Sequence, residues 1–322
     1  MPGEAATPWI DGLSAQAVGE AVRSAVPRLA GAAVELNVSF EQSNPYWHHG
    51  TARVGPAHFV KFAWSQEAAN ELAHERRVML ALSETRFARW MPPLLAAPQR
   101  PLLIVTQLVE GVPCWGDVLD DASVNATLAR DLADALADLH DPAVVADLRR
   151  DGIEPRAPAP QAETGAIRSR LGRFLDAAHV PLVHRWCDWT DHVQARPTGE
   201  RVLLHGDVHG HNLLVHEGRL RCVLDYDAVS LGDHHYDLRY LPTNEPTIGF
   251  LVRTAEEYER RTGRVVEPAP LLAWHIRTVL GDALWRSEAG VPLPGGGTVH
   301  EWVEELRVVI GELAEWRPFA LP

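Results

Sequence analysis

The sequence is poor in the features that mark several large classes of protein. Only three of its 322 residues are cysteines, Cys114, Cys187 and Cys222, and none forms a CxxC pair. Such a sparse, odd number argues against a disulfide framework and favours reduced thiols. No run of 18 apolar residues occurs, which excludes an ordinary membrane-spanning helix. The first residues, MPGEAATPWIDG, have neither a basic nor an apolar region, so we expect no signal peptide and a cytoplasmic location.

Positive charge is also scarce. Lys and Arg number 30 against 43 Asp and Glu, which gives a formal net charge of −13. Nucleic-acid binding needs clustered Lys and Arg, so we expect no nucleic-acid partner. Because no membrane-spanning run occurs, we also expect no membrane partner. An acidic chain is compatible with a cationic small-molecule substrate, and the protein is expected to act as a monomer or a homodimer.

Strands are expected mainly in the first third of the chain and helices in the rest. Residues 58–63 form a β-prone run, residues 65–82 the first long helical pattern, and residues 102–108 a short apolar strand. Beyond Pro113, residues 125–140 place four leucines on one helical face. The sequence therefore predicts an α+β fold with two lobes, residues 1–110 and residues 111–322.

Three oxygen-bearing side chains in the second part are spaced in a way that suits a metal site. Asp207 lies five residues before Asn212, in a loop that follows the apolar strand 202–204. Asp225 comes thirteen residues after Asn212, at the end of a hairpin whose turn is Glu217-Gly218. Such a hairpin would return Asp225 to the neighbourhood of Asn212. Carboxylate and amide oxygens are ligands that Mg²⁺ prefers, so a magnesium site is expected here.

A family resemblance gives these residues specific roles. HGDVHGHN (205–212), VLDYD (223–227) and GDHHYDL (232–238) resemble the HGDxxxxN, strand-Asp and GDxxxDL motifs of the aminoglycoside phosphotransferase family, which is related to choline kinases and protein kinases. The resemblance implies a bilobal, protein-kinase-like fold and transfer of the γ-phosphate of ATP or GTP to a small-molecule hydroxyl. It implies that Asp207 is the catalytic aspartate and that Asn212 and Asp225 bind Mg²⁺. Asp237 would brace the catalytic loop through backbone hydrogen bonds.

The same resemblance implies a nucleotide site in residues 1–110. Lys61, inside the β-prone run, would contact the phosphates, and Glu75 on the next helix would form an ion pair with it; Glu71, one turn away, is the less favoured partner. Backbone groups around Gln107 and Val109 would recognise the purine edge. A plain buried strand and turn remains the alternative for that segment.

The expected phosphate-covering turn departs from the protein-kinase pattern. Residues 41–45 (EQSNP) contain no glycine, whereas protein kinases use a glycine-rich loop. The Ser43 hydroxyl and neighbouring N–H groups could contact phosphate, and an ordinary turn is the alternative.

Other functions stay open at this point. The alternating His205, Asp207, His209 and His211 could suggest zinc, but a zinc hydrolase has no use for the later Asn and Asp residues. A protein kinase is disfavoured because HRD, DFG and APE motifs are missing. A catalytically silent nucleotide-binding relative is a further alternative.

The acceptor is the least defined part of this interpretation. An aminoglycoside-like or other cationic antibiotic is favoured, which would make the protein a resistance enzyme. A metabolic kinase for an amino alcohol, sugar or amino acid is the alternative. Asp233, Asp282 and Glu288 could receive substrate ammonium groups, although a solvated surface is the simpler expectation for each.

Overall fold

The computed structural model describes residues 10, 13–37, 49–196, 199–243, 247–294 and 297–321. The chain divides into two compact units. The first unit takes in Met1–Gly111, Ala143–Glu154 and Arg221–Val229, and the second takes in Val112–Pro142, Pro155–Leu220 and Ser230–Pro322. The first is built around a sheet and the second is mostly helical, so the expected α+β class is confirmed. The division of labour between residues 1–110 and 111–322 stays a prediction.

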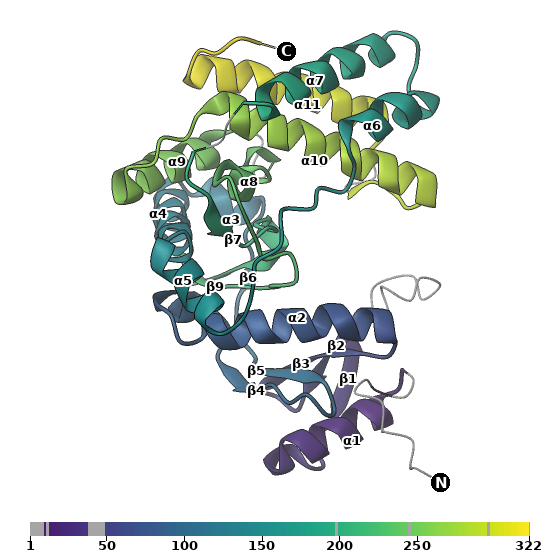
Figure 1. Ribbon diagram of the computed structural model, residues 1–322, viewed down its shortest axis with the longest axis vertical. Helices are drawn as coiled ribbons and strands as arrows, with labels where there is room; N and C mark the ends of the chain where they lie inside the picture. Colours follow the sequence, from purple (N-terminus) through teal and green to yellow (C-terminus); the bar gives the residue numbers. More distant parts are fainter. Residues whose placement is uncertain are drawn as a thin grey trace. The chain divides into compact units, whose positions relative to one another are not determined.

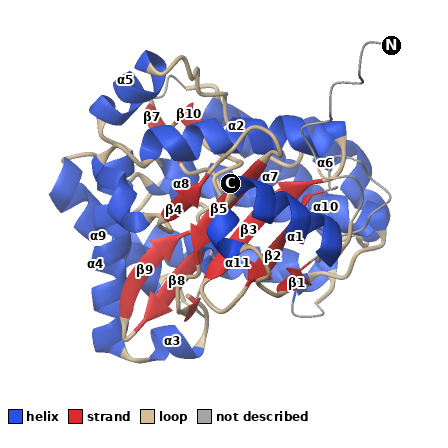
Figure 2. Ribbon diagram, turned by 90° about the horizontal axis from the view of Figure 1, so that it is seen from below, coloured by secondary structure: helices blue, strands red, loops and turns tan. Residues whose placement is uncertain are grey.

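A five-stranded antiparallel sheet forms the centre of the first unit. Its order is β1-β2-β3-β5-β4, and Figure 2 shows these strands side by side. The strands are β1 (Val34–Asn37), β2 (His49–Val54), β3 (His58–Ala63), β4 (Leu94–Ala96) and β5 (Leu103–Gln107). In β3, Lys61 pairs with Thr51 on one side and Ile104 on the other, so it lies in the middle of the sheet.

The two faces of this sheet are covered by different helices (Figure 1). Helix α1 (Ala15–Ala25) follows the N-cap Ser14 and packs its valines against Val60 and Phe62. Because side chains alternate along a strand, Lys61 points to the opposite face, where α2 (Gln66–Leu82) lies. The period of β3 thus aims the lysine at helix α2.

The remaining elements of the first unit are short. The 3-10 helix η1 (Pro27–Leu29) follows α1, and η3 (Arg86–Trp90) follows α2. Helix α5 (Pro142–Arg150) belongs to this unit from Ala143 onward. The segment 221–229 also joins it, which brings Asp225 into the same unit as Lys61.

Helices make up most of the second unit. They are α3 (Asp117–Asp120), α4 (Ala122–Leu139), α6 (Thr164–Arg170), α7 (His179–Gln194), α8 (His235–Leu238), α9 (Gly249–Thr262), α10 (Pro268–Ala289) and α11 (Val299–Trp316), with 3-10 turns η4 (Leu171–Phe174) and η6 (Leu241–Thr243). The leucine face predicted for residues 125–140 is buried in α4, which packs against α9 (Figure 2). Helix α10 packs against α6, α7, α8 and α11 and so forms the centre of this unit.

Two small sheets support the loop that carries the main motif. Strand β7 (Val202–Leu204) pairs antiparallel with β10 (Ser230–Gly232). Strands β6 (Val112–Pro113), β8 (Leu213–His216) and β9 (Arg219–Val223) form the other sheet, in the order β6-β8-β9. The motif loop runs from the end of β7 through the 3-10 turn η5 (Gly210–Asn212) into β8.

None of the helices in the described part of the chain combines the length and the apolar character that crossing a bilayer requires.

The core between α1 and the sheet should dominate the stability of the first unit. Phe62 is fully buried there. We expect Phe62→Ala to lower the free energy of unfolding by about 3–5 kcal/mol, because it removes buried apolar surface and leaves a cavity. Leu80→Ala, at a residue 36% exposed on α2, should cost less than about 1 kcal/mol. Denaturant unfolding checks both, and equal losses would contradict the assigned core.

Candidate active site

Lys61 is the centre of an ion-pair network within the first unit. Its Nζ lies 2.7 Å from Glu75 Oε2 and 2.7 Å from Asp225 Oδ1. Burial alone would lower the pKa of Lys61, but the carboxylates of Glu75 and Asp225 outweigh it, and the pKa of Lys61 is raised well above its ordinary value. Lys61 therefore stays charged. The structure brings Lys61 together with Glu75, the favoured partner from the sequence.

Glu75 is held from the other side as well. Its side chain is almost completely buried, and Oε1 accepts a hydrogen bond from Tyr226 N at 3.3 Å. Burial raises the pKa of Glu75, and the ammonium of Lys61 opposes that rise. Asp225 has φ 68°, an uncommon conformation for a residue other than glycine. At this turn after β9, the Asp225 side chain contacts Lys61 and the Tyr226 N–H contacts Glu75.

In the second unit, Asp237 holds the start of the loop 205–212. Its Oδ2 accepts a hydrogen bond from His205 N at 2.8 Å, and its Oδ1 accepts one from Gly206 N at 2.7 Å. His140 Nε2 lies 3.0 Å from the same Oδ2. The predicted role of Asp237 as a brace of this loop is therefore confirmed. Burial would raise the pKa of Asp237. The hydrogen bond from His140 and the charge interactions with His140 and His205 outweigh burial, so the pKa of Asp237 is lowered.

Arg239 holds the same loop through the backbone carbonyl of Gly206. Its Nη2 donates to Gly206 O at 2.7 Å, and its guanidinium lies between the rings of Tyr236 and Tyr240, at 3.7 Å and 4.2 Å from their centroids. Two backbone amides and one carbonyl of the loop are thus held by buried charged groups. Asp207 follows directly after this fixed segment.

Asp207 and Asn212 contact each other in the second unit. Asn212 Nδ2 donates to Asp207 O and to Asp207 Oδ2, both at 2.9 Å. Burial would raise the pKa of Asp207, but the hydrogen bond from His209 and the charge of Arg239 outweigh burial and lower it. Asp207 is therefore a carboxylate at neutral pH, about a quarter exposed. Since the nitrogen of the Asn212 amide faces Asp207, its carbonyl oxygen is the end of the side chain suited to bind a cation.

These oxygen donors suit Mg²⁺ by their chemistry. Asp225 offers a partly exposed carboxylate and Asn212 an amide oxygen, and both are hard ligands. The assignment of Asn212 and Asp225 to one metal site stays a prediction, because they belong to different units.

For two of the remaining sequence-predicted site residues, Gln107 and Val109, the structure gives a position but no contact that tests their role. Gln107 ends β5 with an exposed side chain, and its N–H donates to Pro93 O at 2.9 Å. Val109 follows the strand and is half-buried. Their purine-recognition role stays a prediction. Ser43 lies outside the described residues.

Three acidic residues considered as receivers of substrate ammonium groups are already paired. Asp282 Oδ2 accepts from Arg286 Nε at 2.8 Å. Glu288 is bound by Arg170 and Arg173. Asp233 Oδ1 accepts from His235 Nδ1 at 2.6 Å. Two tryptophans of α7 have structural roles, since Trp186 is buried in the core and Trp189 donates to Ala320 O.

Sequence reasoning missed His209 and Arg239 as contacts of the loop, and His140 as a partner of Asp237. His209 Nδ1 accepts from His211 N at 3.2 Å, so its Nε2 is the protonated nitrogen that faces Asp207 Oδ2 at 3.3 Å. Among the described residues, two groups of His and carboxylate side chains converge as a metal site requires, and neither lies in the loop 205–212. The zinc interpretation of that loop therefore has no geometric support.

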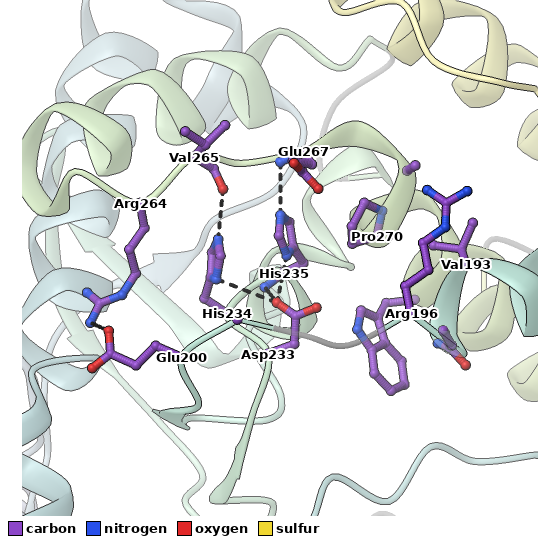
Figure 3. Close-up of a pocket in the computed structure, with 14 residues that line it drawn as sticks. Val193, Arg196, Glu200, Asp233, His234, His235, Arg264, Val265, Glu267 and Pro270 are labelled. Atoms are coloured by element: carbon purple, nitrogen blue, oxygen red, sulfur yellow. Dashed lines mark hydrogen bonds and ion pairs between the residues drawn. The ribbon is translucent and has the colours of Figure 1, made fainter.

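One cavity of about 400 Å³ lies in the second unit, away from this loop. Figure 3 shows Asp233, His234 and His235 on one wall, and Arg264 and Arg196 at its two sides. None of its lining residues belongs to the loop 205–212. We therefore do not assign the acceptor to this cavity.

Replacing Asp237 should weaken the support of the loop 205–212 while leaving the side chain of Asp207 itself unchanged. Asp237→Asn puts an amide where a carboxylate accepts two N–H groups, so we expect a loss of about 1–3 kcal/mol in the free energy of unfolding at neutral pH. The pKa of Asp237 is lowered by folding, so its contribution is complete above the unfolded value of about 3.9 and fades as pH falls through the folded value. Denaturant unfolding at several pH values should show the difference from wild type shrinking in acid. If the difference in the free energy of unfolding between wild type and Asp237→Asn does not change with pH, Asp237 does not hold the loop as described. An equal loss in the exposed control Asp188→Asn would contradict that role as well.

Comparison with solved structures places this geometry in a known fold. The spectinomycin phosphotransferase in complex with ADP and spectinomycin is 13% identical, with TM-score 0.66, over 96% of this chain and 100% of that chain. The GDP complex of aminoglycoside 2'-phosphotransferase-IIIa is 16% identical, with TM-score 0.65, over 94% and 99%. The macrolide 2'-phosphotransferase from Brachybacterium faecium is 20% identical, with TM-score 0.56, over 96% and 99%. At these identities the likeness shows the bilobal, kinase-like α+β fold.

The family itself is shown by the sequence. A search of curated proteins finds no match. A family model described as the phosphotransferase enzyme family matches residues 36–272, which span Lys61, Glu75, Asp207, Asn212 and Asp225. As its motifs predicted, this chain belongs to the phosphotransferase enzyme family.

Proposed function

We propose that this protein transfers the γ-phosphate of ATP or GTP to a hydroxyl group of a small molecule. The observation that carries the proposal is Asp207, an ionised carboxylate on a loop whose preceding amides are held by Asp237. Phosphoryl transfer needs a fixed carboxylate that orients the acceptor hydroxyl and takes up its proton. Asp207 has the charge state, the partial exposure and the rigid support for that role.

The nucleotide is assigned to the first unit. Lys61 holds its phosphates, and Glu75 fixes the direction of the ammonium group through the 2.7 Å ion pair. A lysine with a raised pKa keeps the full positive charge that phosphate binding requires. Backbone groups near Gln107 and Val109 contact the purine, and Ser43 is assigned to the phosphates from its sequence position alone.

Asn212 and Asp225 are the proposed ligands of Mg²⁺. When bound, the ion neutralises charge on the phosphate oxygens during transfer. Within the first unit, Asp225 contacts Lys61, so the same carboxylate that would bind Mg²⁺ also orients the phosphate-binding lysine. Within the second, Asn212 fixes the position of Asp207 through two hydrogen bonds.

An antibiotic is the acceptor class we favour. The similar structures include phosphotransferases named for aminoglycosides, macrolides and spectinomycin. A hydroxylated metabolite is the second candidate. Asp282 and Glu288 are already paired with arginines, so these two carboxylates are not open to the ammonium groups of a cationic antibiotic. A polycationic substrate would need other carboxylates.

A substrate panel separates these acceptors. Release of ADP or GDP is measured with an aminoglycoside, a macrolide, spectinomycin, an amino sugar, choline and homoserine, each in the presence of Mg²⁺. Turnover of an antibiotic well above that of the metabolites is the expected result. Preferential turnover of choline, homoserine or the amino sugar would establish a metabolic kinase. Absence of turnover together with absence of nucleotide binding would overturn the enzymatic proposal.

Removal of the proposed base tests the mechanism directly. Asp207→Ala should lower kcat by at least about 10²-fold, since it removes the group that takes up the hydroxyl proton. Its affinity for nucleotide should stay within a few-fold of wild type, because Lys61 and Asp225 remain. His211→Ala, in the same loop but without an assigned role, is the control and should keep most activity. Near-normal turnover by Asp207→Ala would rule out its catalytic role.

A further inference from the structure

Four side chains converge at the starts of two helices in the second unit, away from the residues assigned to phosphoryl transfer. His179 is the first residue of α7 and Asp176 precedes it by three residues. His300 and Glu304 lie four residues apart in α11, and therefore on one face of that helix. One imidazole and one carboxylate thus come from the start of α7 with the turn before it, and another such pair comes from the start of α11.

The distances within this cluster are those of a compact ligand set. Asp176 Oδ1 lies 2.8 Å from His179 Nδ1, and Asp176 Oδ2 lies 3.7 Å from His300 Nε2. One ligand atom from each of these three residues falls within 4.8 Å of the others. Two ligands of a tetrahedral zinc ion with bonds of about 2.0 Å stand about 3.3 Å apart. The separations of 2.8 Å and 3.7 Å, each to a different oxygen of the Asp176 carboxylate, lie on either side of that value.

Hydrogen bonds already engage the ligand atoms of this cluster, and a metal ion would replace them. His179 lies between two carboxylates, with Nδ1 2.8 Å from Asp176 Oδ1 and Nε2 3.0 Å from Glu304 Oε1, so without metal both ring nitrogens donate. The lone pair of His300 Nε2 accepts from Asp176 N at 3.0 Å. A metal ion bound by Asp176, His179 Nδ1 and His300 Nε2 would displace the Nδ1 proton, as metal binding to a protonated ligand requires, while Glu304 would still hold Nε2.

We propose that Asp176, His179 and His300 form a Zn²⁺-binding site that joins the N-terminal ends of α7 and α11. Two imidazoles and one carboxylate are a ligand set that zinc accepts, with water as the fourth ligand. Glu304 supports the site by holding the far nitrogen of His179, as carboxylates do for zinc-bound histidines. Asp176, His300 and Glu304 are each at least two-fifths exposed, so the ion reaches the site from solvent.

The other convergent group in the second unit is much less accessible to an ion. Asp233, His234 and His235 also cluster, on the wall of the cavity in Figure 3. There His235 Nε2 accepts from Glu267 N at 2.9 Å, and Nδ1 donates to Asp233. These three side chains are between 6% and 13% exposed, whereas those of Asp176 and His300 are 55% and 41% exposed. The cluster at Asp176 is therefore the one that an ion can reach directly from solvent.

A second proton is the competing occupant of the site. The hydrogen bonds to Asp176 and then to Glu304 raise the pKa of His179, so without metal its ring is stabilised as an imidazolium between two carboxylates. This ion pair does not use His300 as a partner of His179. His300 is therefore the residue that distinguishes a zinc site from a simple ion pair.

Zinc titration of the tag-free protein in excess Mg²⁺ tests the proposal, with heat of binding and Tm as readouts. Wild type should bind one Zn²⁺ saturably and gain thermal stability. His300→Ala should bind zinc at least about tenfold more weakly and lose the Tm gain, while its Tm without zinc stays near that of wild type. His192→Ala, which removes an exposed histidine of the same helix, should bind zinc as wild type does.

Two results would overturn the site. Wild type that shows no saturable zinc binding has no such site. Equal zinc affinity in His300→Ala and wild type would place the bound ion elsewhere among the 16 histidines. Neither readout depends on phosphoryl transfer, so the site is tested separately from the proposed function.

Discussion

The position of one buried ammonium group decides how the first unit can act. Lys61 lies in the middle of a five-stranded sheet, and its Nζ is 2.7 Å from both Glu75 and Asp225. A charge taken out of water is costly unless it is paired, and two carboxylates on one lysine leave an excess of negative charge at this point. A bound cation would relieve that excess. The network therefore suits a site that is completed by a metal-bound nucleotide.

A comparable constraint operates in the second unit, where Asp237 fixes the backbone of the two residues that precede Asp207. The carboxylate of Asp237 is fully buried and is used entirely by backbone N–H groups and His140. Buried polar groups that are fully hydrogen-bonded fix one conformation and disfavour others. Arg239, between two tyrosine rings, fixes the carbonyl of Gly206 in the same way. Rigid support of this kind is what catalysis by positioning requires.

Much of this arrangement follows from local sequence pattern. The alternation of β3 and the 3.6-residue period of α2 bring Lys61 and Glu75 together, and the GDxxxDL motif anticipates the hydrogen bonds of Asp237. Ser14 immediately precedes helix α1, and its side chain accepts from Ala17 N, as a serine at an N-cap does. In these cases the information lies within a few residues.

Other features depend on contacts between distant residues and were not accessible in this way. His140 meets Asp237 across 97 positions in sequence, and Glu288 meets Arg170 across 118. No local pattern reports such partners, so the bracing histidine and the neutralised acids emerge from the structure alone.

The central claim is that Lys61 and Asp225 belong to a nucleotide site that requires a metal ion. Calorimetric titration with ATP and with GTP, in Mg²⁺ and in a chelator, tests it most directly in wild type and in Asp225→Ala. Saturable binding of at least one nucleotide by wild type in Mg²⁺ is predicted, with binding lost in the chelator and in Asp225→Ala. Binding of equal strength in all of these conditions would contradict the account.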